Sequence, residues 1–291
     1  MKLDHIIIGA GRSGTTSLVA YLKQHPLINF SSIKEVTYFS IDDHYNRKID
    51  FLHSFFDELK QGLCSTSDTY LLMDANAPKR LAEYNPNVKI TVILREPSAR
   101  THSNYNYSTN HRYLDESLSL MESQKLEEAV LLKGDVIKRN NECSFYGSLY
   151  HLHLTNWLNY FSKEQIFICT MNQLKNDPQT LMNNYFDFLG LDKILIEELL
   201  PKNKSVHIKS KILNDFLVNR NHPLRRLIRK PLHNSFLRNL IFNSKLVEKI
   251  KNRNKKEHTY RELNKEEKEF CHNYFQEDLQ NLQEDFGIKF D

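Results

Sequence analysis

Ten residues near the N-terminus combine three glycines, four hydroxyl side chains and one arginine, in the order Gly9-Ala10-Gly11-Arg12-Ser13-Gly14-Thr15-Thr16-Ser17-Leu18. The glycines allow the main chain to turn tightly, which brings several N–H groups close to a ligand. From Leu18 onward the apolar residues have helical spacing, so this loop comes directly before a helix N-terminus. Backbone N–H groups at such a position bind phosphate. We therefore predict a phosphate-binding loop that uses the N–H groups of residues 13–17 and the hydroxyl groups of Thr15 and Thr16.

The loop departs from the nucleotide triphosphatase pattern. Gly9 and Gly14 have the spacing of a P-loop, but Thr15 stands where that motif has lysine. A triphosphatase also needs an acidic residue near the end of a neighbouring strand to hold Mg²⁺. The strongest predicted strand, residues 88–94, is followed instead by Arg95. A cation there repels a metal ion and attracts phosphate, so we expect a phosphate site without a metal.

An alternation of strands and helices positions these residues. Apolar and β-branched stretches predict strands at residues 3–8, 28–30, 70–73, 88–94 and 165–170. Helical spacing predicts helices at residues 51–59, 78–84, 97–108, 115–139, 145–161 and 178–189. This order is typical of a doubly wound parallel sheet, in which ligands bind at the carboxyl ends of the strands. Segment 31–40 and Arg95 both follow predicted strands, so we expect them beside the loop.

The 291 residues suit one large α/β domain, with residues 1–200 as its core and a helical, basic part at 201–291 that completes the same domain. The chain begins in a strand pattern, without the features of a signal peptide, and it has no apolar run of about 18 residues. The four cysteines are widely spaced and lack a C-x-x-C pattern, which predicts free thiols. We therefore expect a cytoplasmic enzyme.

The net charge of +4 hides a segregation of charge. Residues 201–256 contain 16 Lys and Arg but only two acids, which leaves 24 basic and 34 acidic residues elsewhere. Strand signals cease beyond residue 201, and basic residues alternate with apolar ones at helical spacing over 223–250. Three interpretations are open: a solvated basic face, a lid over an anionic acceptor, or a peripheral contact with a membrane surface. No recognition motif accompanies the charge, so we expect no nucleic-acid partner.

Four stretches in order resemble the sulfotransferases that use 3′-phosphoadenosine 5′-phosphosulfate (PAPS), especially the carbohydrate type related to the heparan sulfate enzymes and their bacterial relatives. They are the loop 11–18, the Lys-Glu-x-x-Tyr-Phe segment 34–39, the segment 94–105 with arginine and serine eight apart, and the pair Leu-x-x-Asp-Pro with Phe-Leu-Gly-Leu between residues 174 and 191. The resemblance covers about residues 3–191. It implies a P-loop NTPase-like three-layer α/β/α fold with a central parallel sheet and a helical C-terminal extension.

The resemblance also implies roles for single residues. Glu35 is then the general base, and Lys34 steadies the sulfuryl oxygens. Arg12 stands where the family usually has lysine, so it neutralises the leaving phosphate but does not readily donate a proton. By this resemblance, the 5′-phosphosulfate binds at residues 12–17 (Arg12, Ser13, Gly14, Thr15, Thr16, Ser17). The 3′-phosphate binds at Arg95 and Ser103, and the adenine contacts Tyr146. Lys209 belongs to the late loop that closes over the cofactor phosphates.

Several features compete with or depart from this pattern. His5, His25 and His102 are alternative bases, because the cytosolic branch of the superfamily uses histidine; we rank His102 below Glu35. We expect Arg100 to be structural. Residues 74–78 lack the lysine of the Glu-Lys-x-Pro segment that is frequent in carbohydrate sulfotransferases, so we expect a different acceptor side.

We therefore expect a sulfotransferase that moves a sulfuryl group from PAPS to a hydroxyl or amine of a glycan or glycolipid, without a metal ion. Two other classes stay open at this point. The glycine spacing favours an Mg²⁺-dependent P-loop kinase or NTPase, and Arg12 favours a non-catalytic nucleotide-binding relative.

Overall fold

The computed structural model describes residues 2–197, 206–208, 210, 255–257 and 260–290. The chain forms two compact units. The core unit comprises residues 1–105, 120–203 and 263–291, and the small unit comprises residues 106–119 and 204–262. All the predicted site residues except Lys209 belong to the core unit, and Lys209 lies outside the described residues.

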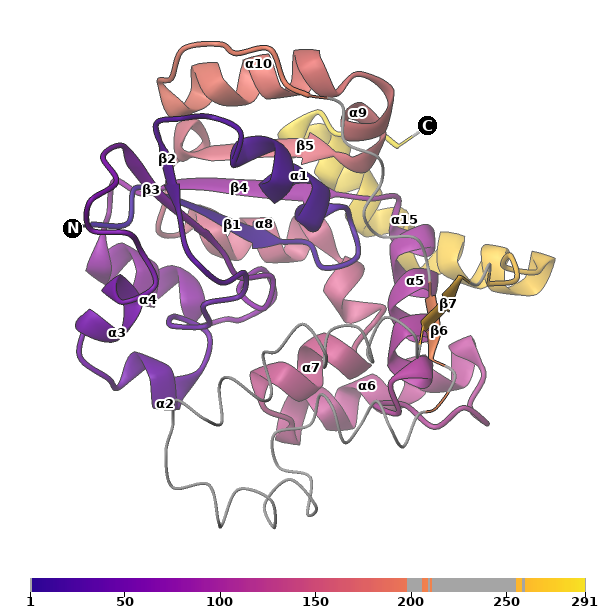
Figure 1. Ribbon diagram of the computed structural model, residues 1–291. Coiled ribbons are helices and arrows are strands. Elements are labelled where there is room, and N and C mark those ends of the chain that lie inside the picture. Colours follow the sequence, from indigo (N-terminus) through magenta and orange to yellow (C-terminus); the bar gives the residue numbers. More distant parts are fainter. Residues whose placement is uncertain (1, 198–205, 209, 211–254, 258–259, 291) are drawn as a thin grey trace. The chain divides into compact units, whose positions relative to one another are not determined.

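The core unit is built on a five-stranded, all-parallel sheet with the strand order β2-β3-β1-β4-β5 (Figure 1). The strands are β1 (His5–Gly9), β2 (Ile28–Phe30), β3 (Leu63–Ser67), β4 (Lys89–Leu94) and β5 (Ile166–Thr170). The chain leaves β1 toward β2 on one side of the sheet and leaves β4 toward β5 on the other. The carboxyl ends of β1 and β4 therefore form the switch point at which parallel sheets bind ligands.

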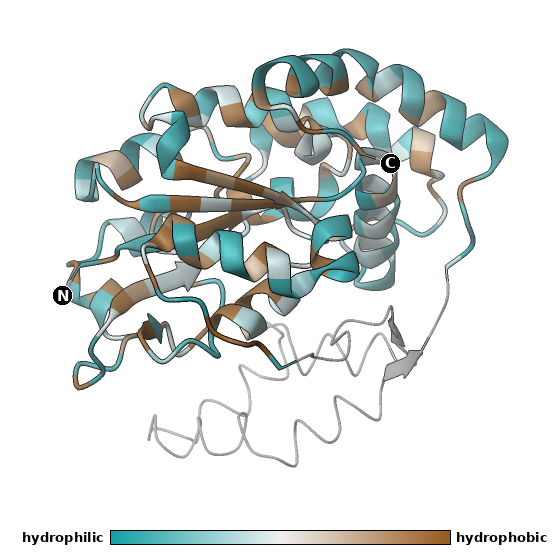
Figure 2. Cartoon of the chain, turned by 90° about the horizontal axis from the view of Figure 1, so that it is seen from above, coloured by the Kyte–Doolittle hydropathy of each residue, from teal (hydrophilic) through white to brown (hydrophobic). Residues whose placement is uncertain are grey.

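Helices cover both faces of the sheet, which gives three layers. Alternate residues of β1 and β4 point to opposite faces, as the two-residue period of a strand requires. Ile6, Ile8 and Val92 lie in one core with residues of α4 (Ala77–Tyr84), α8 (Tyr150–Leu158) and α15 (Lys265–Phe286). Ile7 and Ile93 lie in the other core with residues of α1 (Thr15–Leu22) and α10 (Pro178–Leu189). Figure 2 shows the apolar strands between helices that carry hydrophilic residues outward.

The remaining described helices are short or peripheral. They are α2 (Asp42–Tyr45), α3 (Asp50–His53), α5 (Pro97–Asn110), α6 (Leu120–Lys133), α7 (Val136–Glu142), α9 (Met171–Asn176) and two 3₁₀ turns at Tyr146–Ser148 and Lys163–Gln165. In the small unit, β6 (Val206–Ile208) pairs antiparallel with β7 (Lys255–Glu257). The expected absence of strands beyond residue 201 is therefore wrong. Most of the basic segment lies outside the described residues, and the joining of 201–291 to the core as one domain stays a prediction.

The predicted strand at residues 70–73 is wrong: the third strand is β3, and residues 70–73 form a turn after it. The strand was missed because its inward residues are hydroxylic. Ser65 Oγ is 2.7 Å from His5 Nδ1, and Thr66 Oγ1 is 2.8 Å from Ser31 Oγ, so these buried polar groups are satisfied inside the sheet. Leu71 and Leu72 are apolar because they pack into the core from the turn.

Three predicted helices differ in extent. Only one turn, α3, forms within residues 51–59, and residues 115–139 form two helices, α6 and α7, with a break at Gly134 and a side-chain cap from Asp135. The segment 145–161 begins with a 3₁₀ turn and continues as α8. The helices predicted at 78–84, 97–108 and 178–189 are confirmed within one or two residues, and α10 ends at Gly190, which has a left-handed conformation.

Candidate active site

The phosphate loop connects β1 to α1 at the switch point, as the sequence predicts. Gly9 has φ 157°, and an added Cβ there would lie 2.8 Å from Leu72 Cβ. Gly14 is the N-cap of α1, with φ 95° and without a side-chain cap. In the described part of the chain, no residue accepts a hydrogen bond from the N–H groups of Thr15 and Thr16. The helix therefore presents open donors, as an anion site requires.

The structure narrows the predicted set of N–H donors. The Ser13 N–H donates to the Ala10 carbonyl at 3.3 Å, and the Ser17 N–H donates to the Gly14 carbonyl at 3.0 Å. These two groups are used within the chain, whereas those of Thr15 and Thr16 are not. The sequence pattern could not separate them, because the difference depends on the conformation of the turn.

Arg12, Arg95 and Ser103 come together from three elements. Arg12 is in the loop, Arg95 follows β4, and Ser103 is on α5. The Arg12 Nε donates to Ser103 Oγ at 3.4 Å, and the Arg95 Nη1 donates to the Arg12 carbonyl at 3.4 Å. Arg12 thus contacts both members of the predicted pair, Ser103 through its side chain and Arg95 through its carbonyl. We call these three residues the anion group.

The electrostatics of the anion group favour a negatively charged ligand. Burial lowers the pKa of Arg95, and the positive charge of Arg12 lowers it further. Both side chains stay charged in the working range, because a guanidinium has a pKa above about 12 in water. A phosphate about 4 Å from one guanidinium gains about 4 kcal/mol at an effective dielectric constant near 20, before desolvation costs. An anion therefore relieves the repulsion between the arginines.

Arg100 anchors the loop, which agrees with the structural role expected for it. This residue is only 2% exposed. Its Nε donates to the Gly11 carbonyl at 3.1 Å, and its Nη1 donates to the Ser144 carbonyl at 3.0 Å and to Ser148 Oγ at 2.9 Å. Its side chain also packs against Gly147, where an added Cβ would lie 2.9 Å from Nη1. Arg100 thus ties the phosphate loop to the segment that precedes α8.

Glu127, on α6, fixes that segment in turn. Its carboxylate accepts hydrogen bonds from the Phe145 N–H at 2.8 Å and the Tyr146 N–H at 2.7 Å. Burial raises the pKa of Glu127 to about 7, although these hydrogen bonds lower it. The Tyr146 ring packs with Val130 in a small apolar cluster and lies 4.8 Å from the His153 ring. The structure therefore groups the Tyr146 ring with this cluster and not with the anion group.

Glu35, the predicted base, follows β2 and is held by neighbours on both sides. Its Oε2 accepts from the Thr69 N–H at 2.6 Å and the Thr69 hydroxyl at 3.2 Å, and its Oε1 is 2.5 Å from Lys34 Nζ. Its own N–H donates to the Ser67 carbonyl at 2.8 Å. The Glu35 side chain is still 27% exposed, so a substrate can reach it.

Thr69 links the base to the phosphate loop. An added Cβ at Gly11 would lie 3.8 Å from Thr69 Oγ1, the same hydroxyl that donates to Glu35. The loop after β3 therefore lies between the predicted base and the predicted phosphate site. An acceptor hydroxyl at Glu35 and a phosphosulfate on the loop can meet in this arrangement.

Two of the three alternative histidine bases are buried among structural contacts. His5 is fully buried between strands, where it contacts Ser65, Thr91 and Tyr185, and burial lowers its pKa to about 3. His25 is buried against Phe186, with its Nε2 3.0 Å from the Asp192 carbonyl. Both histidines therefore have structural contacts. His102 is half-buried on α5.

Asp68 is a feature of the site that the sequence analysis missed. It directly follows β3 and is 2% exposed, with its Oδ2 2.7 Å from Ser40 Oγ. It was missed because the third strand was expected at residues 70–73. The sequence analysis compared Asp74 with the family's Glu-Lys-x-Pro segment, but Asp74 caps the turn before α4 through the Asn76 N–H. The residues that adjoin Glu35 are Asp68 and Thr69 instead.

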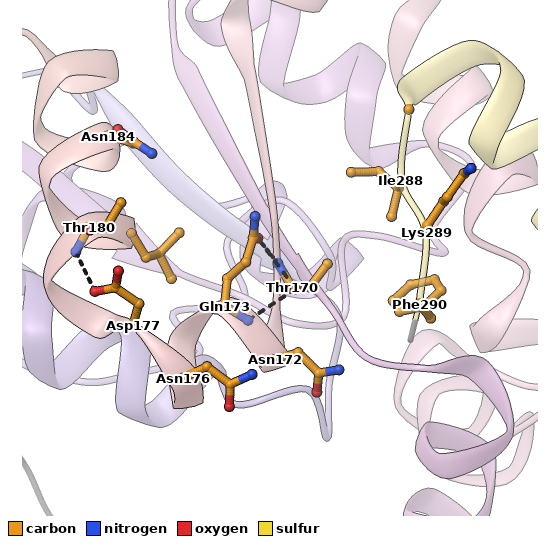
Figure 3. A pocket seen from close by; sticks show the side chains of 12 residues that line it. Thr170, Asn172, Gln173, Asn176, Asp177, Thr180, Asn184, Ile288, Lys289 and Phe290 are labelled. Carbon is orange, nitrogen blue, oxygen red and sulfur yellow. Dashed lines mark hydrogen bonds between the residues drawn. The ribbon is translucent and has the colours of Figure 1, made fainter.

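A separate cavity of about 560 Å³ lies beside α9 (Figure 3). Amide side chains of α9 and α10 line it, together with residues 287–290 of the C-terminal segment. It includes none of the predicted site residues. The same short helix contacts the phosphate loop, because an added Cβ at Gly14 would lie 3.5 Å from Leu174 and 3.6 Å from Met171.

Three general features of the described residues bear on the predicted class. All four cysteines are buried free thiols. Within the described ranges, no three His, Cys, Asp or Glu side chains gather as a metal site would need. Every described helix is too short or too polar to cross a lipid bilayer.

Comparison with known proteins gives a consistent result. The sequence model of the sulfotransferase domain matches residues 2–286. The bifunctional heparan sulfate N-deacetylase/N-sulfotransferase 4 of Mus musculus is 32% identical over 203 residues, which are 65% of this chain and 23% of that protein. The membrane-associated sulfotransferase kil1 of Dictyostelium discoideum is 23% identical over 296 residues, covering 73% of this chain and 62% of that protein. This chain therefore spans less than two thirds of the length of either relative.

A solved structure shows the same fold. The crystal structure of a sulfotransferase from Alicyclobacillus acidocaldarius superposes with a TM-score of 0.68 and 19% sequence identity, covering 100% of this chain and 98% of that one. The predicted three-layer α/β fold with a central parallel sheet is therefore confirmed. Because the domain match covers nearly the whole chain and its fold is that of a solved sulfotransferase, this chain belongs to the sulfotransferase family.

Proposed function

We propose that this chain transfers a sulfuryl group from PAPS to a hydroxyl or amine of a glycan or glycolipid, with Glu35 as the general base. The observation that carries this proposal is the position of Thr69. It donates to the Glu35 carboxylate and adjoins Gly11 of the phosphate loop, which supports a site shared by the base and the phosphate loop.

The residues present suit the charges of PAPS. The open N–H groups of Thr15 and Thr16, with the Arg12 side chain, would hold the 5′-phosphosulfate. Arg95 and Ser103 would hold the 3′-phosphate, since a guanidinium and a hydroxyl both donate hydrogen bonds to phosphate oxygens. PAPS supplies an activated sulfuryl group when it is bound.

The transfer then needs three acts from the chain. Glu35 accepts the proton of the acceptor hydroxyl while the oxygen of that hydroxyl forms a bond to sulfur. The bond between sulfur and the bridging oxygen breaks, and the electron pair stays on the 5′-phosphate oxygen. Arg12 stabilises that charge without giving up a proton. Lys34 is positioned by its contact with Glu35 and would steady the sulfuryl oxygens once the substrate displaces it.

The glycan or glycolipid class rests on the relatives. Two features separate this proposal from an Mg²⁺-dependent kinase. Thr15 replaces the P-loop lysine, and the Arg95 cation stands at the end of β4 beside the loop. A cation there opposes a divalent metal by Coulomb repulsion.

The decisive experiment measures binding of 3′-phosphoadenosine 5′-phosphate (PAP), the product, by calorimetry. Arg95→Ala should weaken binding about 10- to 100-fold, the effect of losing a hydrogen bond to a charged group. Lys125→Ala removes an exposed positive charge from α6 and should change binding less than about twofold. Failure of the unaltered protein to bind PAP would overturn the proposal.

A turnover assay tests the catalytic part. Glu35→Gln should lower kcat by about 100-fold or more, the usual effect of losing a general base, and should retain PAP binding. Glu128→Gln, an exposed carboxylate on α6, is the matched control. If Glu35→Gln were as active as Glu128→Gln, Glu35 would not be the base. If no acceptor from a panel of glycans and glycolipids were sulfated by a protein that binds PAP, the chain would be a non-catalytic relative.

A further inference from the structure

Asp68 is a buried carboxyl group without a cationic partner. Its side chain accepts a hydrogen bond from Ser40 Oγ at 2.7 Å and from the Tyr70 N–H at 3.1 Å. Within the described ranges no Lys, Arg or His forms an ion pair with it. Two neutral donors rarely compensate the desolvation of a buried carboxylate.

The residues on either side of Asp68 both bind Glu35. The Ser67 carbonyl accepts from the Glu35 N–H at 2.8 Å, and the Thr69 N–H donates to Glu35 Oε2 at 2.6 Å. Ser40, the partner of Asp68, closes the segment that begins at Lys34. The segments 34–40 and 67–70 are therefore joined at three points, with the Asp68 carboxyl between them.

The charges around Asp68 all bear on its protonation. Burial raises the pKa of Asp68 to about 7, and the negative charges of Glu35 and, to a smaller extent, Asp74 also raise this pKa. The hydrogen bonds from Ser40 and Tyr70 lower it. Lys34 is the cation of this neighbourhood but contacts Glu35. On the α4 side, Arg80 is directed to the Phe39 carbonyl and to Asp42. Among the described residues, no cation contacts Asp68 to offset the cost of a second negative charge.

We propose that Asp68, buried between the two segments that hold Glu35 and without a cationic partner, holds a proton there, so that the two carboxyl groups carry one negative charge between them, and that Asp68 thereby tunes the base. This inference rests on the proposed role of Glu35. While Asp68 is neutral, the site holds one anion, Glu35, which suits an anionic donor. When Asp68 ionises, the second negative charge beside the site favours transfer of the acceptor proton toward the carboxylates. Asp68 is a positioning residue, since it acts through Glu35.

Asp68→Asn imitates the neutral acid with little change of shape. The amide oxygen can accept from the Tyr70 N–H, and the amide nitrogen can donate to Ser40 Oγ. Both contacts of Asp68 are then retained, but the group can no longer ionise. The variant therefore separates the titration of Asp68 from its structural contacts.

The first test is a titration by NMR of protein labelled with ¹³C at the aspartate carboxyl carbons, with the Asp68 signal assigned by its loss in Asp68→Asn. We expect a midpoint near neutrality, and a midpoint about one pH unit lower in Glu35→Gln, where the neighbouring charge is gone. Glu128→Gln should leave the midpoint unchanged. A midpoint near pH 4 in the unaltered protein, or an equal midpoint in Glu35→Gln, would overturn the proposal.

The second test compares the sulfuryl-transfer rate at pH 6 and pH 8 with saturating donor and acceptor. The unaltered protein should be about threefold to tenfold faster at pH 8, whereas Asp68→Asn should show a ratio near one. Equal ratios would refute the tuning of Glu35. The NMR titration needs no turnover, so an inactive protein with linked carboxyl groups would count against the proposed function and not against the linkage.

Discussion

The contacts of Arg100 predict a loss of both stability and PAP affinity in Arg100→Lys. The guanidinium makes three charge-assisted hydrogen bonds, to the Gly11 carbonyl, the Ser144 carbonyl and Ser148 Oγ. A lysine ammonium is a point donor on a different stem and cannot reproduce the two directions of this planar fork. Its charge stays buried, so each lost contact leaves an unsatisfied group.

The size of the effect follows from these contacts. A hydrogen bond to a charged group contributes about 1.5–3 kcal/mol, so losing two contacts should lower the free energy of unfolding by about 3–6 kcal/mol. The Gly11 carbonyl is also released, which loosens the loop that carries Arg12 and the open N–H groups. We expect PAP affinity to fall about tenfold or more, because misplaced donors bind less well.

Urea unfolding with and without PAP measures both effects in one assay. At a PAP concentration 100 times the Kd of the unaltered protein, binding should add about 2.7 kcal/mol to stability. A variant with tenfold weaker binding should gain only about 1.4 kcal/mol at the same concentration. Arg47→Lys, at an exposed arginine over the Phe51 ring, is the control and should change stability by less than about 0.5 kcal/mol.

Two results would refute this reasoning. One is a stability change below about 1 kcal/mol in Arg100→Lys, since buried charged contacts of this kind cost more when broken. The other is an unchanged stabilisation by PAP in an Arg100→Lys protein whose free energy of unfolding is strongly lowered. That outcome would show that Arg100 supports the fold without placing the phosphate loop.

Three further substitutions test other parts of the site. Gly14→Ala forces an alanine into φ 95°, so it should cost about 1 kcal/mol or more in urea unfolding and weaken PAP binding measured by calorimetry. Glu127→Gln can accept only one of the two N–H groups at Phe145 and Tyr146, so it should lower the free energy of unfolding by about 1–3 kcal/mol near pH 8, where the native carboxyl is ionised; a change below about 0.5 kcal/mol would contradict the contacts. Asp68 binds a proton more tightly when folded, so its contribution to stability is full at acid pH and is lost as the pH rises toward about 7. The stability of Asp68→Asn relative to the unaltered protein should therefore increase between about pH 4 and pH 8, and a pH-independent difference in urea unfolding would contradict the raised pKa.

The anion group was predictable because its signals are local. The glycines of the loop and the hydroxyls after them are adjacent in sequence and indicate a turn before a helix. Arg95 and Ser103 lie on a strand end and the following helix, so their spacing alone places them on the same side. The structure adds that Arg12 connects them.

The supporting residues were not predictable in the same way. Arg100 contacts Gly11 across 89 positions of the chain and Ser144 across 44, and no periodic pattern encodes such pairings. Asp68 was missed because β3, the strand before it, has a polar composition that is unusual for a central strand. Its hydroxyl groups are buried, with contacts to His5 and Ser31. The apolar residues Leu71 and Leu72 therefore led to a strand prediction at residues 70–73, which form the turn after β3.

The two residues proposed to carry the chemistry share an unusual backbone. Arg12 has φ 70° and Glu35 has φ 59°, and a non-glycine residue in this left-handed region costs about 1 kcal/mol or more. In each case a hydrogen bond to the main chain opposes relaxation: the Arg95 side chain donates to the Arg12 carbonyl, and the Glu35 N–H donates to the Ser67 carbonyl. The strain is therefore held by the same elements that form the site. Because one contact comes from the end of β4 and the other from the end of β3, the carboxyl end of the sheet holds both Arg12, the charge proposed to stabilise the leaving group, and Glu35, the carboxylate proposed to accept the proton.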